Sequence, residues 1–249
     1  MEGLTNLNLK DFNSSKVTNM TYMFWKCESL PSLDLSSFDT SSVTEMEGMF
    51  SQSKSLTSLD LRNFDTSNVF NMSSMFARMD SLQSVNLSSF NTSEVETMDY
   101  MFWDSISLKS ADLSSFDTSN VIVMHSMFAN CTNLEEVNLT SFDTSKVVFL
   151  SAMFRDCSKL KVIDLSSFSS AKLQDSHSMF IGCASLETIY ANSELVLIDS
   201  SYTGSHLFTG CTSLKGGAGT VFDSSHDSAD YARIDDPTNG KPGYFTLKE

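Results

Sequence analysis

The residues best suited to chemistry at neutral pH are four histidines and five cysteines. The histidines are His125, His177, His206 and His226. Neither His125 nor His177 has a second His or Cys at the spacing of metal ligands. The sequence also shows no serine nucleophile elbow, no phosphate-cradling glycine loop and no dinucleotide fingerprint. We therefore expect no catalytic residues, no metal site and no cofactor, and a protein that is not an enzyme.

The cysteines share one recurring position with small or weakly polar residues. They are Cys27, Cys131, Cys157, Cys183 and Cys211, and Ser53, Met79 and Ser105 stand at equivalent places. This exchange predicts a tight buried site in which a free thiol acts as a small apolar group. Disulfides are the alternative, because stacked Cα atoms about 5 Å apart lie within disulfide range. Stacked side chains point in parallel rather than at each other, which favours free thiols.

Acidic side chains recur in two series. The first carboxylate series is Asn8, Asp34, Asp60, Asn86, Asp112, Asn138 and Asp164. The second is Asn13, Asp39, Asp65, Asn91, Asp117, Asp143 and Ser169. Asp and Asn bond nearby backbone amides in turns and caps, and this is the role we expect for the second series.

The first carboxylate series is expected on the exposed face of a sheet, where three interpretations remain open. It is a solvated surface, or a docking face for a basic partner, or a place where Ca²⁺ bridges neighbouring carboxylates. No Asp-Gly-rich calcium loop supports the third interpretation. The candidate binding residues of the docking face are Asp34, Asp60, Asp112 and Asp164.

Aromatic and apolar residues at outward positions form a second candidate site. Trp25 and Trp103 share one repeat position, and Tyr22 and Tyr100 share another. The tryptophan position varies freely elsewhere, being Ser51, Ala77, Ala129, Arg155 and Ile181. Ile122 and Phe149 are expected to add an apolar patch. Tryptophan and tyrosine favour interface hot spots, so these residues predict a protein contact; packing within the flank, or against an absent neighbour, is the alternative.

These positions recur because the chain is built from a repeat of 26 residues. The first phenylalanine of each unit recurs at Phe12, Phe38, Phe64, Phe90, Phe116, Phe142 and Phe168. Units begin near residues 4, 30, 56, 82, 108, 134, 160 and 186. One unit cannot bury its apolar side alone, whereas stacked units share a continuous core.

Each unit is predicted to be a short strand, a turn and a short helix. Leu33 and Leu35 alternate as in a strand. The apolar residues of segment 43–50 have helical spacing, and Ser42 with Glu45 fits a capping box before it. The methionine and phenylalanine positions of this segment are expected to line the core.

The repeat contains the strings Leu-Asp-Leu-Ser-Ser-Phe-Asp-Thr-Ser, Val-x-x-Met-x-x-Met-Phe and Cys-x-x-Leu, the last as in Cys131 to Leu134. In these strings it resembles the BspA-like leucine-rich repeat family of bacterial surface proteins. Segments 231–235 and 242–245 resemble the end of such arrays. The resemblance implies a leucine-rich repeat solenoid of about eight strand–turn–helix coils with a parallel β-sheet face. It also implies an extracellular or cell-surface bacterial protein, often an adhesin or host-contact protein.

We expect a solenoid over residues 1–213 and a C-terminal cap over 214–249. The start near residue 4 lacks a capping element, which predicts a cut through a longer array. No apolar run approaches the ~20 residues of a membrane helix. A net charge of −15 and a pI near 4.5 exclude nucleic acid as a partner.

The function expected from the sequence is that of a non-enzymatic binding module. Its partner would be a protein or a glycan, including a host extracellular-matrix protein or a basic protein. The alternative is a passive spacer or stalk within a larger cell-wall protein.

Overall fold

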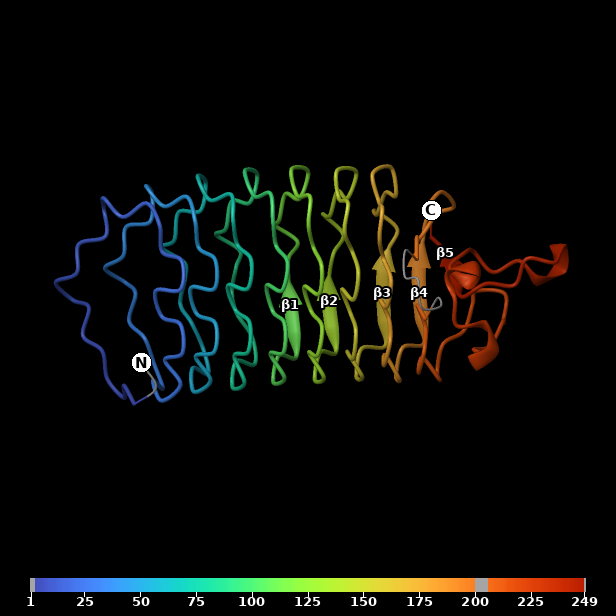
Figure 1. Cartoon of the computed structure of the whole chain (residues 1–249), viewed down its shortest axis with the longest axis horizontal. Coiled ribbons are helices and arrows are strands. Elements are labelled where there is room, and N and C mark those ends of the chain that lie inside the picture. The colour runs from blue at the N-terminus through green and yellow to red at the C-terminus, as the bar shows by residue number, and fades with distance from the viewer. Residues whose placement is uncertain (1–2, 200–205, 249) are drawn as a thin grey trace.

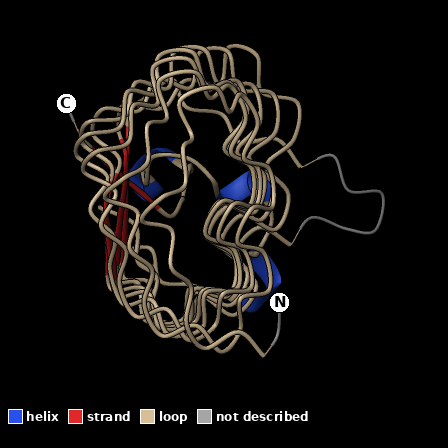
Figure 2. Ribbon diagram, turned by 90° about the vertical axis from the view of Figure 1, so that its left-hand side faces the viewer, coloured by secondary structure: helices blue, strands red, loops and turns tan. Residues whose placement is uncertain are grey.

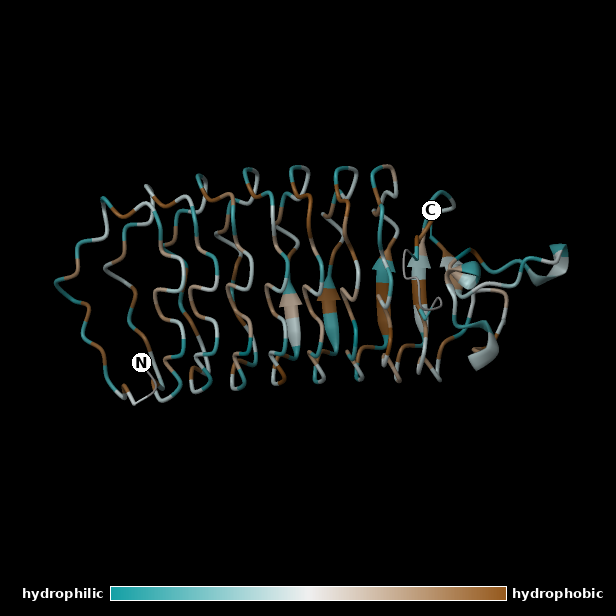
Figure 3. Cartoon of the chain, viewed as in Figure 1, coloured by the Kyte–Doolittle hydropathy of each residue, from teal (hydrophilic) through white to brown (hydrophobic). Residues whose placement is uncertain are grey.

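The computed structural model describes residues 3–199 and 206–248. The chain winds into coils that stack side by side along one axis, with the two ends of the chain toward opposite ends of the stack (Figure 1). Viewed along the stack, the strands lie together on one side of the coils (Figure 2). Apolar and polar residues are interspersed along the coils (Figure 3). The buried apolar residues of successive coils form one hydrophobic core.

The strand side confirms the predicted parallel sheet. The strands are β1 (Ser110–Asp112), β2 (Glu136–Asn138), β3 (Val162–Leu165), β4 (Thr188–Ala191) and β5 (Phe245–Leu247). β1 pairs with β2, and β3 with β4, in parallel and in a register of one repeat, as in Val162 opposite Thr188. β5 comes from the C-terminal segment and lies next to β4, with Phe245 opposite Ile189. The strands thus form a sheet of two, β1 and β2, and a sheet of three, β3 to β5. Whether a domain boundary falls at residue 213 stays a prediction.

The predicted helix in each unit is wrong. Within the described residues no α-helix forms, and the helices are short 3₁₀ turns near the C-terminus: η1 (Ser224–His226), η2 (Ala229–Tyr231) and η3 (Pro237–Asn239). The expected helical segment consists of two tight turns instead. In one unit the Met49 N–H donates to Met46 O (3.2 Å) and the Ser53 N–H to Phe50 O (3.1 Å). The third residue of each turn has positive φ, as in type II turns.

Hydrogen bonding between coils explains the error. The Met46 N–H donates to Asn71 O (2.9 Å) and the Phe50 N–H to Met75 O (3.0 Å), so these amides point along the stack. A helix would need the same amides for carbonyls four residues earlier. Apolar spacing of three, read from the sequence as helical, is equally the spacing between the ends of a tight turn. The capping box is also absent, because the Ser42 hydroxyl donates to Ser15 O of the preceding coil (3.0 Å).

The core contains the methionine and phenylalanine positions that the sequence predicted to face inward. The phenylalanine rings of the Met-Phe position stack coil on coil, for example Phe102 on Phe76 at 5.4 Å and on Phe128 at 5.3 Å between centroids. Methionines recur at two positions of the repeat, which begin at Met20 and Met23. They are buried, apart from Met23, which is half-buried in the first coil. The stack ends on Phe208, whose ring meets Tyr244 edge-on at 5.2 Å.

The cysteine position is confirmed as a buried site with free thiols. All five cysteines are buried and unpaired. The Cys131 thiol donates to Phe102 O of the preceding coil (3.1 Å), and Ser53 and Ser105 hydroxyls make the equivalent bond at 2.7 Å. This shared hydrogen bond is why Ser and Cys exchange here. Burial raises the pKa of Cys131 to about 12, which keeps the thiol protonated at neutral pH.

One buried carboxylate orders the C-terminal segment from within, and the pairing of β5 with β4 joins that segment to the last coil. Asp235 is buried and accepts hydrogen bonds from Ala218 N, Thr220 N and Oγ1, and Gly243 N (2.5 to 3.2 Å). Gly216 fits beside it because a Cβ there would lie 2.2 Å from Gly243 O. Four donors around one carboxylate offset its burial and order the segment that supplies β5.

Candidate binding surfaces

The candidate residues fall on two surfaces. The sheet face consists of the strands and the equivalent segments of earlier coils, and it carries the first carboxylate series. The turn face consists of the paired tight turns, from segment 20–27 onward, and it carries the tryptophans and tyrosines. Because both surfaces repeat by coil, a departure from the repeat is the signal for a specific site.

On the sheet face the carboxylates bond the backbone of their own turns. Asp34 accepts from Ser36 N and Asp112 from Ser114 N, both at 3.0 Å. Hydrogen bonds from the side chain and backbone of Ser36 lower the pKa of Asp34, and those of Ser114 lower the pKa of Asp112. Asn86 accepts the same bond from Ser88 N (3.0 Å), so Asp and Asn are interchangeable here.

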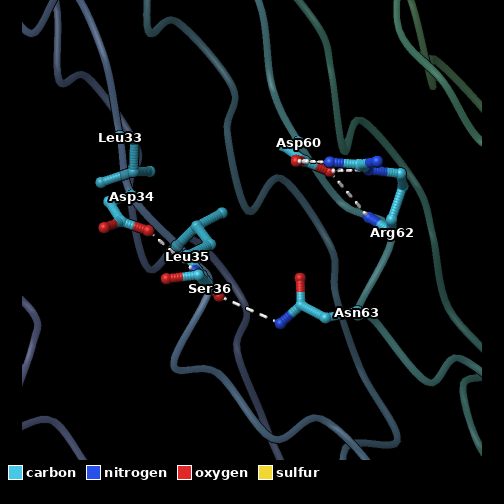
Figure 4. Close-up of a pocket in the computed structure, with 7 residues that line it drawn as sticks. All are labelled: Leu33, Asp34, Leu35, Ser36, Asp60, Arg62 and Asn63. Atoms are coloured by element: carbon cyan, nitrogen blue, oxygen red, sulfur yellow. Dashed lines mark hydrogen bonds and ion pairs between the residues drawn. The ribbon is translucent and has the colours of Figure 1, made fainter.

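Two of the four candidate aspartates are also paired with cations. Asp60 accepts from Arg62 Nε (2.9 Å) and Nη2 (2.6 Å), and these bonds lower its pKa to about 2. Asp164, which is half-buried, is paired with Lys248. A shallow hollow of about 380 Å³ lies between Asp34 and the Asp60–Arg62 pair (Figure 4). Within residues 3–199 and 206–248, Asp34 and Asp112 are exposed and form no ion pair, so they are the two candidate aspartates whose charge is not paired.

The second carboxylate series bonds its turns, which confirms that part of the prediction although no helix follows. Asp39 Oδ1 accepts from Ser41 N (3.1 Å) and Oγ (2.6 Å). The next residue, Thr40, donates to Asp65 O (2.9 Å), and Asp65 N donates back to Thr40 Oγ1 (2.8 Å). The series therefore belongs to the scaffold.

On the turn face two aromatic pairs stand three coils apart. The Tyr22 and Trp25 rings lie 6.0 Å apart, and the Tyr100 and Trp103 rings 5.8 Å apart. Trp25 is 40% exposed, as expected of an outward position, and Trp103 is half-buried. The two coils between the pairs carry small residues at both positions. They are Gly48, Ser51, Ser74 and Ala77.

This pattern of large, small, small and large residues makes a groove of about 580 Å³. Three coil steps of about 4.8 Å separate the two pairs by roughly 14 Å. The groove is lined by Tyr22, Trp25, Ser51, Gln52, Ser74, Ala77, Arg78 and Trp103. The sequence predicted outward positions for both tryptophans but did not predict the floor of small residues between them.

Hydrogen-bonding groups on the floor of the groove are free. Ser51 is only 5% exposed, and within the described part of the chain its hydroxyl has no hydrogen-bond partner. The Gln52 and Ser74 side chains likewise make no hydrogen bond to any described residue. Ser53, two residues away, is fully buried and uses its hydroxyl on Phe24 O. The groove thus differs from the scaffold in having polar groups that the fold does not use.

The charged groups around the groove are paired. Arg78 lies over the Trp103 ring (5.1 Å) and pairs with Asp104 (3.1 Å). Glu47 accepts from the Tyr22 hydroxyl (2.6 Å), and this bond raises the pKa of Tyr22 to about 12. Gly48 makes room for that ring, since a Cβ there would lie 2.1 Å from a Tyr22 ring carbon. The groove therefore offers little free charge.

Ile122 and Phe149 do not line the groove. They are 42% and 41% exposed, and they lie on adjacent coils, where the Val148 N–H donates to Ile122 O (2.8 Å) and Phe149 bridges Val123. Both therefore lie outside the groove, and whether their side chains form one apolar patch stays a prediction. Phe70 is similarly exposed, and its carbonyl accepts from the Glu96 N–H of the next coil.

The histidines are held in pairwise contacts. His125 Nδ1 bonds Ser151 Oγ (2.5 Å), its ring meets Tyr100 at 5.0 Å, and burial lowers its pKa. His177 Nδ1 pairs with Asp175 (2.7 Å). Among residues 3–199 and 206–248 no group of three or more His, Cys, Asp or Glu side chains is arranged to hold a metal. Whether the protein uses a cofactor or calcium stays a prediction.

The stack of parallel coils with a leucine-lined core is that of a repeat solenoid of the leucine-rich kind. The family model described as "Mycoplasma protein of unknown function, DUF285" matches residues 2–109 and 77–193. The chain belongs to this family, a repeat family of the BspA-like kind. No curated protein matches it.

Among solved structures, the chain is similar to a leucine-rich repeat protein from Bacteroides ovatus ATCC 8483. The two are 22% identical, with a TM-score of 0.35, and the match covers 79% of this chain. It spans 56% of the length of the Bacteroides protein. In the part of the chain that the structure describes, no helix is long and apolar enough to cross a bilayer.

Proposed function

We propose that the protein is a non-enzymatic binding module displayed at the bacterial cell surface. Its partner is a protein or a glycan, met by side chains that vary on an otherwise regular stack. Membership of a surface-type repeat family supports the location. The observation that carries the proposal is the groove between the two aromatic pairs, because its free polar groups have no use in the fold.

A passive spacer is the second candidate, and the regularity of the stack supports it. Parallel bridges repeat every 26 residues from Asn19 to Asp175, and the first and second carboxylate series serve mainly the turns. A spacer needs this rigidity and nothing more. It gives no reason for two tryptophans to bracket small residues.

The test is a binding screen of the purified chain against individual extracellular-matrix proteins and defined oligosaccharides, with and without calcium. The groove variant is Trp25→Ala with Trp103→Ala. The sheet-face variant is Asp34→Asn with Asp112→Asn, matched to Asp60→Asn with Asp164→Asn, whose carboxylates are paired.

Each result separates the surfaces. Binding that only the groove variant loses supports the turn face. Binding of a basic partner that the Asp34 and Asp112 variant weakens, with a flatter salt dependence, supports the sheet face. Binding to no member of either panel would leave the spacer as the better account and overturn the proposal.

A further inference from the structure

We infer that the turn-face groove is a carbohydrate-binding site for a short neutral oligosaccharide, whose rings pack on Trp25 and Trp103 while its hydroxyls bond Ser51, Gln52 and Ser74. The inference rests on the proposed function, since it names the ligand class of the groove. It adds what the family description leaves open, namely the chemistry of the ligand and the residues that recognise it.

The first argument is the match between the groove and an amphipathic ligand. A pyranose ring has faces rich in C–H groups and an edge rich in hydroxyls. The groove has indole rings at its two ends and hydroxyl and amide groups between them. Aromatic rings pack against such C–H faces and exclude water there, while the polar groups of a site fix the orientation of the ligand.

The second argument is the unused hydroxyl of Ser51. The Ser51 side chain is 5% exposed, and its hydroxyl makes no hydrogen bond within the described part of the chain. The hydroxyls of Ser53 and Ser105 on the scaffold instead donate to carbonyls of preceding coils. Ser51 lines the groove. A ligand hydroxyl would supply the bond that the protein lacks.

The third argument concerns charge. Arg78 is paired with Asp104, and both carboxylate oxygens of Glu47 accept hydrogen bonds, one from Tyr22 and the other from Asn71 Nδ2 (3.2 Å). The Lys26 ammonium lies over the Trp25 ring at 4.6 Å. A ligand with a strong charge would have to displace these pairs, whereas a neutral oligosaccharide need not.

The fourth argument weighs against an extended peptide. Peptides that add to a sheet gain affinity from main-chain hydrogen bonds. The backbone amides of Gln52 and Arg78 on the groove are already used, because the Gln52 N–H donates to Ala77 O (2.8 Å) and the Arg78 N–H donates to Trp103 O (2.7 Å). Recognition has to come from side chains, and the free side chains here are those that bind hydroxyls.

The chain provides its own probe for the test. It has two tryptophans, and both border the groove, so intrinsic tryptophan fluorescence reports on this site. The ligands to titrate are trisaccharides of glucose, galactose, mannose and N-acetylglucosamine, with calorimetry to confirm the stoichiometry. We expect a saturable fluorescence change with at least one trisaccharide and one site per chain.

Variants then locate the site. Trp25→Ala and Trp103→Ala should each weaken binding about tenfold or more, as removal of an interface tryptophan typically does. Ser51→Ala should weaken it several-fold without lowering the melting temperature. Phe149→Ala, which removes an aromatic ring of similar exposure outside the groove, is the matched control and should bind as the wild type does.

Three outcomes would overturn the inference. The first is that no trisaccharide gives a response at millimolar concentration. The second is that Ser51→Ala and both tryptophan variants bind the sugar as the wild type does. The third is that only charged peptides displace the bound sugar. If the chain still binds an extracellular-matrix protein, the proposed function survives and the ligand class is wrong. If it binds nothing in either panel, both fall together.

Discussion

The sheet face and the turn face are built from the same repeat, yet they use their polar residues differently. On the sheet face, Asp34 and Asp112 bond the amides of their own turns, and Asp60 is held by Arg62. On the turn face, Ser51 and Gln52 are left without partners between two aromatic pairs. Polar residues that keep the repeat therefore serve the fold, and residues that break it are free to serve a ligand.

The same contrast separates interchangeable from singular positions. Asp and Asn exchange along the sheet face because either side chain accepts the same amide bond. A small residue in place of Trp25 or Trp103 would open an end of the groove, and a tryptophan in place of Ser51 or Ala77 would fill it. A shared hydrogen bond thus explains why Asp and Asn exchange, whereas the shape of the groove explains the placement of the tryptophans.

The largest expected effect is in the core that both faces share. Phe90→Ala should lower the free energy of unfolding by about 3–5 kcal/mol, because the side chain is buried and its loss leaves a cavity. Phe12→Ala is the matched control, since the equivalent ring in the first coil is 37% exposed and should cost much less. Chemical denaturation measures both. Equal losses would contradict a core that is sealed by neighbouring coils.

Gly48→Ala tests the wall of the groove and should cost about 1–2 kcal/mol. Ala152 (φ 54°) shows that alanine can occupy this left-handed position, so the cost combines backbone strain with the clash against the Tyr22 ring. In a Tyr22→Ala background the same substitution should cost less, because only the backbone strain is left. A double-mutant cycle measures this coupling, and additive losses would show that the ring does not lie over Gly48.

The pair Ser53 and Ser51 tests the contrast between used and unused hydroxyls. Ser53→Ala should cost about 1–3 kcal/mol because Phe24 O loses its donor in a buried site. Ser53→Cys should be milder, since thiols make this bond in other coils. Ser51→Ala should leave stability unchanged. A comparable loss for Ser51→Ala in thermal melting would mean that its hydroxyl supports the fold and not a ligand.

The smallest effect is a loss of stability in acid. Hydrogen bonds from side chain and backbone lower the pKa values of Asp34, Asp39, Asp65 and Asp112. Their contribution is present above the ordinary aspartate pKa of about 3.9 and is lost as the pH falls through the lower folded values. The melting temperature should therefore fall below about pH 4. Asp39→Asn with Asp65→Asn should fall less steeply, and an identical slope would contradict the assignment.

Much of the fold could be predicted from the sequence. The period of 26 residues, the inward phenylalanine and methionine ladders and the parallel sheet follow from spacing, because stacking is the way such a unit buries its apolar side. The helix could not be distinguished in this way. A tight turn and a helix both return an apolar residue after three positions, and the choice depends on whether amides such as that of Met46 find a carbonyl in the next coil.

The candidate sites show the same division. Sequence spacing placed Trp25 and Trp103 at one outward position, and they do border one groove. It did not identify Ser51, Ser74 or Ala77 as the floor, although the sizes along the chain carry that signal. The spacing also did not distinguish the four candidate aspartates from one another, whereas in the structure Arg62 and Lys248 neutralise the charges of Asp60 and Asp164.

What the sequence determined by itself is the repeat and its buried face, because both depend on spacing along one chain. Only the tertiary structure decided which amides bond between coils, which carboxylates meet a cation and which hydroxyl is left without a partner. Apart from the neighbours Asp60 and Arg62, these contacts join residues that are a coil or more apart in sequence and a few ångströms apart in space. Lys248 and Asp164, 84 residues apart, are one such pair.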